Sequence, residues 1–186
     1  MDAVWAEAVW PNIEGNDFTT TVEIVPGAGR NSEKLKDLAE TLYMVDLNEY
    51  ALEKCRARFA AYKGPCDIQI IKTDGTTLPG VPDRCATFVY SWDSMVHFDR
   101  AVIREYLKEC ARVMKPSATG FIHHSNYGTL NPEAGQIEDA PHLRSNQSKD
   151  NFARQAREAG LEIVSQSVFN WGDVKDLDCI SLFKKA

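Results

Sequence analysis

Short runs of β-branched and apolar residues alternate with helical patterns along most of the chain. Five such runs predict strands, over residues 20–25, 42–45, 68–71, 85–90 and 119–123. Between them, apolar residues spaced three and four apart predict helices that begin near Ser32, Asn48 and Asp99. This alternation predicts an α/β fold with a doubly wound, mainly parallel sheet whose ligand crevice lies at the carboxyl ends of the strands.

The C-terminal third adds a long connection, one helix and two extended runs. Residues 125–147 are polar and carry several glycines and prolines, so we expect a substrate loop there. Ser148 is placed to cap a helix. The last two runs, 161–171 and 179–183, have Gly172-Asp173 between them and predict an antiparallel hairpin at the edge of what is then a seven-stranded sheet.

The composition favours one domain, so we treat residues 1–186 as a unit. A chain of 186 residues that is 44% hydrophobic can bury one core and is short for two. The net charge of -6 argues against a generally basic nucleic-acid surface. Five cysteines without a C-x-x-C pair favour reduced thiols, and no run reaches the ~18 apolar residues of a membrane span. We therefore expect a cytoplasmic protein without nucleic-acid or membrane partners, and a homodimer is its candidate assembly.

A glycine loop, Pro26–Arg30, follows the first predicted strand. Backbone N–H groups at such a strand-to-helix turn can hold a nucleotide-like cofactor. A dinucleotide fingerprint would need a third glycine at position 32, where this chain has Ser32. Asp46 ends the second strand about 20 positions after Gly27, which suits the hydroxyls of an adenosine ribose. The pattern favours S-adenosylmethionine over a nicotinamide dinucleotide but leaves both open.

Several motifs, taken in order, resemble the class I S-adenosylmethionine-dependent methyltransferases over residues 20–184. The motifs are Glu23-Ile24-Val25-Pro26-Gly27-Ala28-Gly29-Arg30, Tyr43-Met44-Val45-Asp46, Thr73-Asp74-Gly75, Phe88-Val89-Tyr90-Ser91-Trp92-Asp93 and Arg112-Val113-Met114-Lys115-Pro116. The resemblance implies a Rossmann-like fold and S-adenosylmethionine as the cofactor. It also implies these cofactor-binding residues: Glu23, Gly27, Gly29, Asp46, Leu47, Asp74, Gly75, Ser91 and Trp92. Asp46 would hold the ribose, and Asp74 would meet the adenine amino group.

Two features depart from the pattern of that family. Val25 stands where the family usually has glycine, so we expect its side chain to narrow the pocket or shift the loop. Residues 1–19 form a shorter N-terminal segment than the family often carries. We expect Trp5 and Trp10 in this segment to belong either to a cover over the site or to a helix that packs on the core.

Methyl transfer to a hydroxyl needs a base near the crevice. Three histidines, His97, His123 and His124, follow the fourth predicted strand or end the fifth, and they are the candidate catalytic residues. Neighbouring side chains on a strand face opposite ways, so His123 and His124 cannot both serve one site, and we favour His124. A metal site that joins these histidines to Asp93 lacks the usual ligand spacing, so we expect no metal.

The acceptor is the least constrained part of the prediction. Nucleic-acid amino methyltransferases carry an Asn/Asp-Pro-Pro-Tyr/Phe stretch after the fourth strand, where this chain has Ser91-Trp92-Asp93-Ser94. The stretch Phe121-Ile122-His123-His124-Ser125-Asn126 resembles small-molecule or saccharide O-methyltransferases. We therefore expect methyl transfer to a hydroxyl of a small molecule, with a saccharide as the first candidate. An NAD-dependent oxidoreductase and a non-catalytic S-adenosylmethionine-binding domain stay open as alternatives.

Overall fold

The computed structural model describes residues 2–133 and 139–186. The expected substrate loop at 125–147 therefore lies partly outside the described residues, at 134–138. Within the described residues, no helix has both the length and the apolar character needed to cross a bilayer.

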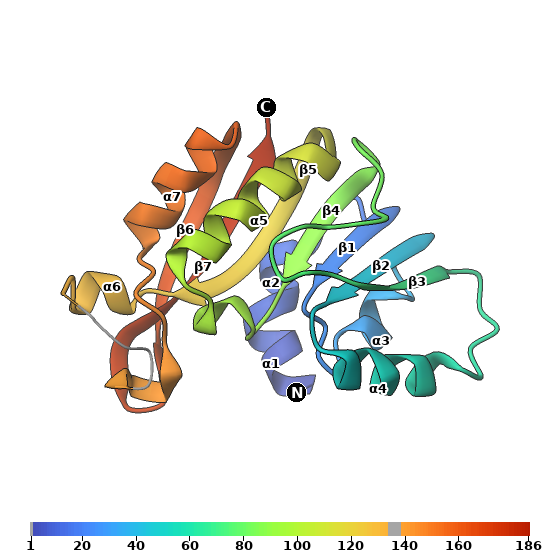
Figure 1. The fold of residues 1–186 in the computed structure, drawn as a ribbon, viewed down its shortest axis with the longest axis horizontal. Coiled ribbons are helices and arrows are strands. Elements are labelled where there is room, and N and C mark those ends of the chain that lie inside the picture. The colour runs from blue at the N-terminus through green and yellow to red at the C-terminus, as the bar shows by residue number, and fades with distance from the viewer. Residues whose placement is uncertain (1, 134–138) are drawn as a thin grey trace.

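One mixed sheet of seven strands forms the centre of the fold (Figure 1). Its order is β3-β2-β1-β4-β5-β7-β6. The strands are β1 Thr20–Ile24, β2 Thr41–Asp46, β3 Asp67–Lys72, β4 Ala86–Ser91, β5 Met114–Ser125, β6 Leu161–Trp171 and β7 Val174–Lys185. Strands β1 to β5 pair in parallel, and β7 pairs antiparallel with both β5 and β6. The predicted doubly wound sheet with an antiparallel hairpin at its edge is confirmed.

The three longer helices begin where the sequence predicts caps. Asn48 accepts the backbone N–H of Tyr50 at 3.0 Å, Asp99 caps α5, and Ser148 caps α7. The longer helices are α4 Glu49–Phe59, α5 Arg100–Val113 and α7 Lys149–Glu158. The shorter helical segments are α1 Asp2–Val4, η1 Trp5–Val9, α2 Trp10–Ile13, α3 Ser32–Leu35, η2 Met95–His97, α6 Tyr127–Leu130 and η4 Pro141–Leu143.

The first predicted helix is much shorter than its apolar spacing suggests. Leucines at 35, 38 and 42 have helical spacing, but α3 ends at Leu35 and Leu38 is 37% exposed. Leu42 lies in β2, where it pairs with Thr21 of β1. Strand pairing at the centre of the sheet therefore overrides the local helical pattern here.

The helices cover both faces of the sheet. On one face, α5 and α7 bury residues such as Ile103, Leu107 and Phe152 against the sheet. On the other face, the N-terminal segment, α3 and α4 bury residues such as Ile13, Leu35 and Phe59. Trp5 stacks on Trp10 with a ring separation of 6.4 Å and lies 6.2 Å from the ring of Tyr90. The N-terminal segment thus packs on the sheet beside β4.

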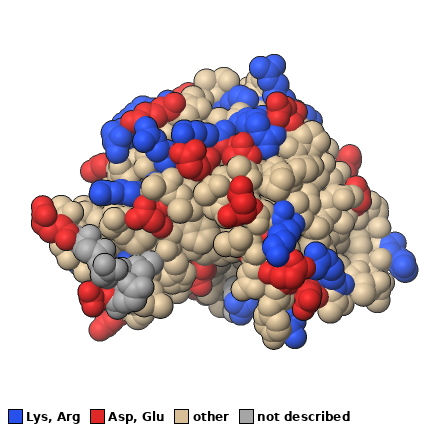
Figure 2. Space-filling view, in the orientation of Figure 1, with Lys and Arg blue, Asp and Glu red and all other residues tan. Residues whose placement is uncertain are grey.

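Charged side chains of both signs are intermixed on the face drawn in Figure 2. The helices α5 and α7 contribute the exposed ion pair between Arg104 and Glu158, whose closest atoms are 3.1 Å apart. At the carboxyl ends of the parallel strands, the loops after β1, β2, β3 and β4 come together; α6 follows β5 at the same edge (Figure 1).

Candidate active site

A cavity of about 300 Å³ opens at the carboxyl edge, between the glycine loop and the end of β4. It is lined by Glu23, Val25, Pro26, Gly27, Ala28, Arg30, Asn31, Trp92, Asp93 and Ser94. Strands β1 and β4 are neighbours, and the chain winds outward from them in both directions, so the cavity lies at the topological switch point of the sheet. Ligands of open α/β sheets bind in this place.

The two glycines of the loop have different surroundings. Gly27 has a φ of +57°, and a Cβ there would meet nothing within 4 Å, so its backbone borders open space in the cavity. Gly29 has a φ of +74°, and a Cβ there would lie 3.2 Å from the Phe59 ring and 3.3 Å from the Cys55 sulfur of α4. Gly27 thus leaves space in the cavity, and Gly29 allows the loop to approach α4.

Val25 adopts the left-handed conformation that its glycine-like position requires. Its φ is +58°, an outlier for a β-branched residue. Its backbone N–H donates to Val45 at 2.8 Å, and its carbonyl accepts the Ser94 hydroxyl at 3.0 Å. Both backbone groups are thus held in place, and Val25 lines the cavity while it also packs against the core under the sheet.

Glu23 is a buried carboxyl at the end of the cavity nearest the sheet. Its side chain accepts the hydroxyl of Ser32 and is only 3% exposed. Burial raises the pKa of Glu23 to about 7; the hydrogen bond from Ser32 opposes this rise, and the nearby charge of Asp46 adds to it. The group therefore titrates near neutral pH.

Asp46 lies directly beside the glycine loop. It is 3% exposed, accepts the backbone N–H of Asn48 at 2.8 Å, and also interacts with the backbone N–H groups of Gly27 and Leu47. Burial raises its pKa, while these backbone donors oppose the rise. The structure thus brings Asp46 and Gly27 together, as expected for one ligand-binding unit.

The ends of β2 and β3 form the adjoining part of this edge. Gly75 has a φ of +93°, and a Cβ there would lie 3.2 Å from the Leu47 side chain, which is 54% exposed. Asp74 is exposed, but its Oδ1 accepts the backbone N–H groups of Thr76 and Thr77, both at 2.9 Å. These donors hold the pKa of Asp74 well below its usual range. Asp74 therefore shapes its own loop, and Leu47 presents an apolar surface beside Gly75.

Ser91 and Trp92 have separate roles at the end of β4. The buried Ser91 hydroxyl donates to the carbonyl of Ile24 at 2.9 Å and joins the ends of β4 and β1. It does not line the cavity, whereas Trp92 does. The Trp92 ring lies 4.4 Å from the His123 ring and 6.0 Å from the Phe121 ring.

Two of the three candidate histidines lie away from the cavity. His124 is fully buried under α7, stacks on Phe152 at 4.2 Å, and has its Nε2 atom 2.8 Å from the Ser181 hydroxyl. Burial lowers the pKa of His124 to about 3. His97 is exposed, and its Nδ1 lies 2.9 Å from the carbonyl of Leu143. The preference for His124 as the base therefore has no support in the geometry, because its ring faces the core on the other side of β5.

His123 lies directly behind the cavity wall. Its Nδ1 accepts the backbone N–H of Asp93 at 3.2 Å, so its Nε2 carries the proton and donates to Asp178 at 3.0 Å. Both ring nitrogens are thus engaged, and burial lowers the pKa of this fully buried histidine although Asp178 opposes the shift. As expected for strand neighbours, His123 and His124 face opposite sides of the sheet.

Arg144 and Asp178 complete a buried charge cluster with His123. Arg144 is 2% exposed and lies in the loop before α7; its Cζ is 4.7 Å from the ring centre of Trp171. Its Nη2 also lies 3.8 Å from the carboxylate of Asp93, which is 39% exposed at the cavity. Sequence reasoning missed Arg144 and Asp178. The available signal was an acid inside the apolar β7 run, because a buried carboxylate needs a paired charge.

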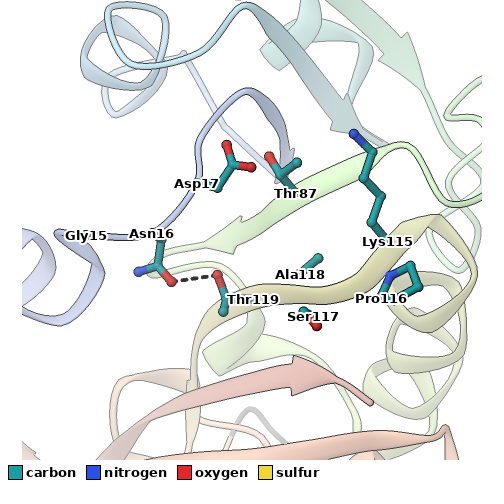
Figure 3. A pocket seen from close by; sticks show the side chains of 9 residues that line it. All are labelled: Gly15, Asn16, Asp17, Thr87, Lys115, Pro116, Ser117, Ala118 and Thr119. Carbon is teal, nitrogen blue, oxygen red and sulfur yellow. Dashed lines mark hydrogen bonds between the residues drawn. The ribbon is translucent and has the colours of Figure 1, made fainter.

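A second cavity, of about 350 Å³, lies at the amino ends of the strands (Figure 3). Thr87 of β4, Lys115 of β5 and Asp17 of the loop before β1 line it. Asn16 accepts the hydroxyl of Thr119 at 2.6 Å on one side. None of the predicted cofactor or catalytic residues lines this cavity. In residues 2–133 and 139–186, no group of three or more histidine, cysteine or acidic side chains is arranged to hold a metal ion.

Comparisons with known proteins support the same reading of the fold. A family model described as a methyltransferase domain matches residues 22–117. The chain belongs to this methyltransferase family. The match contains the glycine loop, Asp46, Asp74 and Trp92, and it confirms the prediction of a methyltransferase over that of an oxidoreductase. No curated protein matches the chain.

Solved methyltransferases share the whole architecture. A SAM-dependent methyltransferase from Aquifex aeolicus is 16% identical with a TM-score of 0.70, and the alignment covers 100% of this chain and 94% of that one. An S-adenosylmethionine-dependent methyltransferase from Clostridium acetobutylicum is 15% identical with a TM-score of 0.71, covering 100% and 90%. At these identities the likeness shows the fold alone, and it confirms the Rossmann-like fold. Both descriptions agree with the cofactor predicted from the sequence.

Proposed function

We propose that this methyltransferase transfers a methyl group from S-adenosylmethionine to a hydroxyl of a small polar molecule, with a saccharide as the first acceptor class. One observation carries the proposal. A single cavity at the switch point joins the open backbone of Gly27, beside the buried Asp46, to the side chains of Trp92 and Asp93. The cofactor side and the acceptor side of such an enzyme need this adjacency, because the reacting atoms must be aligned.

The residues present fit S-adenosylmethionine. The space above Gly27 has no Cβ to fill it, Asp46 offers a buried carboxylate for ribose hydroxyls, and Leu47 offers an exposed apolar surface for an adenine ring. When bound, the cofactor supplies a methyl group on a sulfonium, which an oxygen nucleophile takes by in-line displacement. Gly29, Asp74 and Ser91 support this site through the packing and hydrogen bonds of their own loops.

The acceptor side of the cavity supports a polyhydroxylated ligand. Asp93 and Ser94 bring a carboxylate and a hydroxyl group to the lining, and Trp92 brings an aromatic ring. A few polar groups beside an aromatic surface can fix the orientation of a small ligand that carries several hydroxyls.

Calorimetric titration with S-adenosylmethionine, followed by labelled-methyl transfer to sugars, phenols and amines, tests the proposal. We expect cofactor binding with the wild-type chain and label in a sugar ether. Label on phenols alone would keep O-methylation and replace the acceptor class. Label on amines alone, or binding without transfer to any acceptor, would contradict hydroxyl methylation. Binding of NAD in place of S-adenosylmethionine would contradict the cofactor.

A further inference from the structure

We propose that Asp93 is the catalytic proton acceptor for the attacking hydroxyl, and that His123 and Arg144 are positioning residues that hold it at the cavity. This inference rests on the proposed function and names the group that takes the proton. It replaces the histidines that the sequence suggested as bases.

The lining of the cavity leaves few candidates for a base. Among the described residues that line it, the charged side chains are Glu23, Arg30 and Asp93. The guanidinium of Arg30 has hydrogen-bond donors and no acceptor, so it is not a candidate base. Glu23 is 3% exposed and is bonded to Ser32 at the sheet end of the cavity. Asp93 has a carboxylate that is 39% exposed at the lining, so it can reach a bound acceptor.

The backbone of Asp93 is held in a conformation that its neighbours impose. Its φ is +54°, in the left-handed region that non-glycine residues seldom adopt. The N–H of Asp93 donates to Nδ1 of His123, whose ring is fixed in turn by Asp178. The His123 ring also lies against Trp92 and Trp171, at centre distances of 4.4 Å and 5.6 Å. A buried and doubly bonded ring therefore sets the course of the backbone at Asp93.

Arg144 contacts Asp93 from the buried side. Nη2 of Arg144 donates to Asp178 at 2.7 Å and lies 3.8 Å from Oδ1 of Asp93. Arg144 thus lies between one buried carboxylate and the carboxylate at the cavity, and its ion pair with Asp93 fixes the place of that side chain. Arg144 belongs to the expected substrate loop, so its ion pair with Asp93 also places this part of the loop beside the acceptor side of the cavity.

Asp93 takes the proton of the attacking hydroxyl in the proposed reaction. The hydroxyl oxygen of the acceptor forms a bond to the methyl carbon while the methyl–sulfur bond breaks, and both electrons of that bond stay on sulfur. The hydroxyl proton passes to a carboxylate oxygen of Asp93. The neutral acid then loses this proton to solvent, which its partly exposed side chain allows.

Substitution of Asp93 tests the catalytic part. With the hydroxyl acceptor that the wild type methylates, Asp93→Asn should lower kcat by roughly 10²–10⁴-fold. It should leave the Kd for S-adenosylmethionine and the KM for the acceptor within about threefold, and kcat should become dependent on hydroxide as bulk base replaces the carboxylate. Asp173→Asn is the matched control, because its carboxylate is 94% exposed in the turn between β6 and β7 and should leave kcat unchanged.

Substitution of His123 tests the positioning part. His123→Ala should lower kcat per cofactor-binding molecule, counted by calorimetric titration, and His123→Gln should restore part of it. The glutamine amide can accept the N–H of Asp93 and donate to Asp178, as the imidazole does. A role in folding alone would lower the number of binding-competent molecules and leave kcat per molecule at the wild-type value.

The outcomes separate the inference from the proposed function. Absence of methyl transfer to every hydroxyl acceptor would overturn the proposed function and the role of Asp93 with it. Transfer by the wild type together with full kcat in Asp93→Asn would overturn only the role of Asp93. A large loss of kcat in Glu23→Gln, together with full kcat in Asp93→Asn, would show that Glu23 and not Asp93 accepts the proton.

Discussion

Arg144 holds both carboxylate oxygens of Asp178 in a fork, with Nε 2.9 Å from Oδ1 and Nη2 2.7 Å from Oδ2. Both side chains are buried, so the pair is shielded from solvent. Burial raises the pKa of Asp178, but the hydrogen bonds from His123 and Arg144 outweigh it, and the net pKa is lowered. The stability that this shift contributes is present at neutral pH and is lost as the pH falls below the unfolded-state value of about 3.9.

Arg144→Ala should therefore destabilise the fold strongly, because it leaves the carboxylate of Asp178 buried without its cation. Breaking a buried pair in this way costs about 3–5 kcal/mol. Urea unfolding at pH 7 measures the change. The control is Arg154→Ala, which removes the exposed pair with Glu158 and should change the free energy of unfolding by about 0.5 kcal/mol or less. Equal effects of the two substitutions would show that the fork contributes no more than a surface pair.

The sequence predicts the cofactor side of the site well, because local signals define it. A strand that runs into glycines, a carboxylate at the end of the next strand, and the cap at Asn48 each reflect geometry over a few residues. The structure brings Gly27 and Asp46 together accordingly. The alternation of strands and helices likewise predicts the mainly parallel sheet that the structure has.

The acceptor side depends on contacts between distant segments, which a local pattern does not contain. Arg144 and Asp178 are 34 positions apart and meet only when the loop before α7 folds over β7. Alternation along β5 predicts that His123 and His124 face opposite ways, but not which face α7 covers. The length of α3 was likewise decided by the pairing of Leu42 with β1 rather than by local spacing.

Glu23→Gln should remove a pH dependence of stability. The pKa of Glu23 is about 7 in the folded chain, whereas the ordinary value is 4.5. Between these two pH values the folded state therefore keeps a proton that the unfolded chain has released. The wild-type free energy of unfolding should thus fall as the pH rises through this range, by up to about 1.4 kcal/mol per unit. Urea titrations from pH 4.5 to 8 measure it. The Glu23→Gln variant should lack this slope. The control Glu40→Gln, at an exposed position, should keep it. Parallel pH profiles for wild type and Glu23→Gln would contradict the raised pKa of Glu23.

Asp46→Ala should weaken binding of S-adenosylmethionine. A charged hydrogen bond to a ribose hydroxyl contributes about 1.5–3 kcal/mol, which corresponds to roughly a 10- to 100-fold rise in Kd. Isothermal titration gives this Kd directly, with Asp37→Ala as the control because its exposed carboxylate pairs only with Lys36 in the described contacts. An unchanged Kd in Asp46→Ala would remove Asp46 from the cofactor site.

Val25→Gly should tighten cofactor binding, because it removes a side chain from the cavity wall at a position whose φ of +58° suits glycine. Relief of backbone strain stabilises the folded chain by about 1–2 kcal/mol. The greater flexibility of glycine in the unfolded chain costs about 0.5–1 kcal/mol. Because these effects oppose each other, the free energy of unfolding should change little. We expect the Kd for S-adenosylmethionine to fall roughly three- to tenfold, about 0.7–1.4 kcal/mol. Calorimetry and thermal unfolding measure the two effects separately. Ala28→Gly is the matched control, since Ala28 lines the same cavity without a positive φ, so its substitution removes a methyl group from the lining but relieves no backbone strain. Weaker binding in Val25→Gly would mean that the valine side chain contacts the cofactor favourably and belongs to its site.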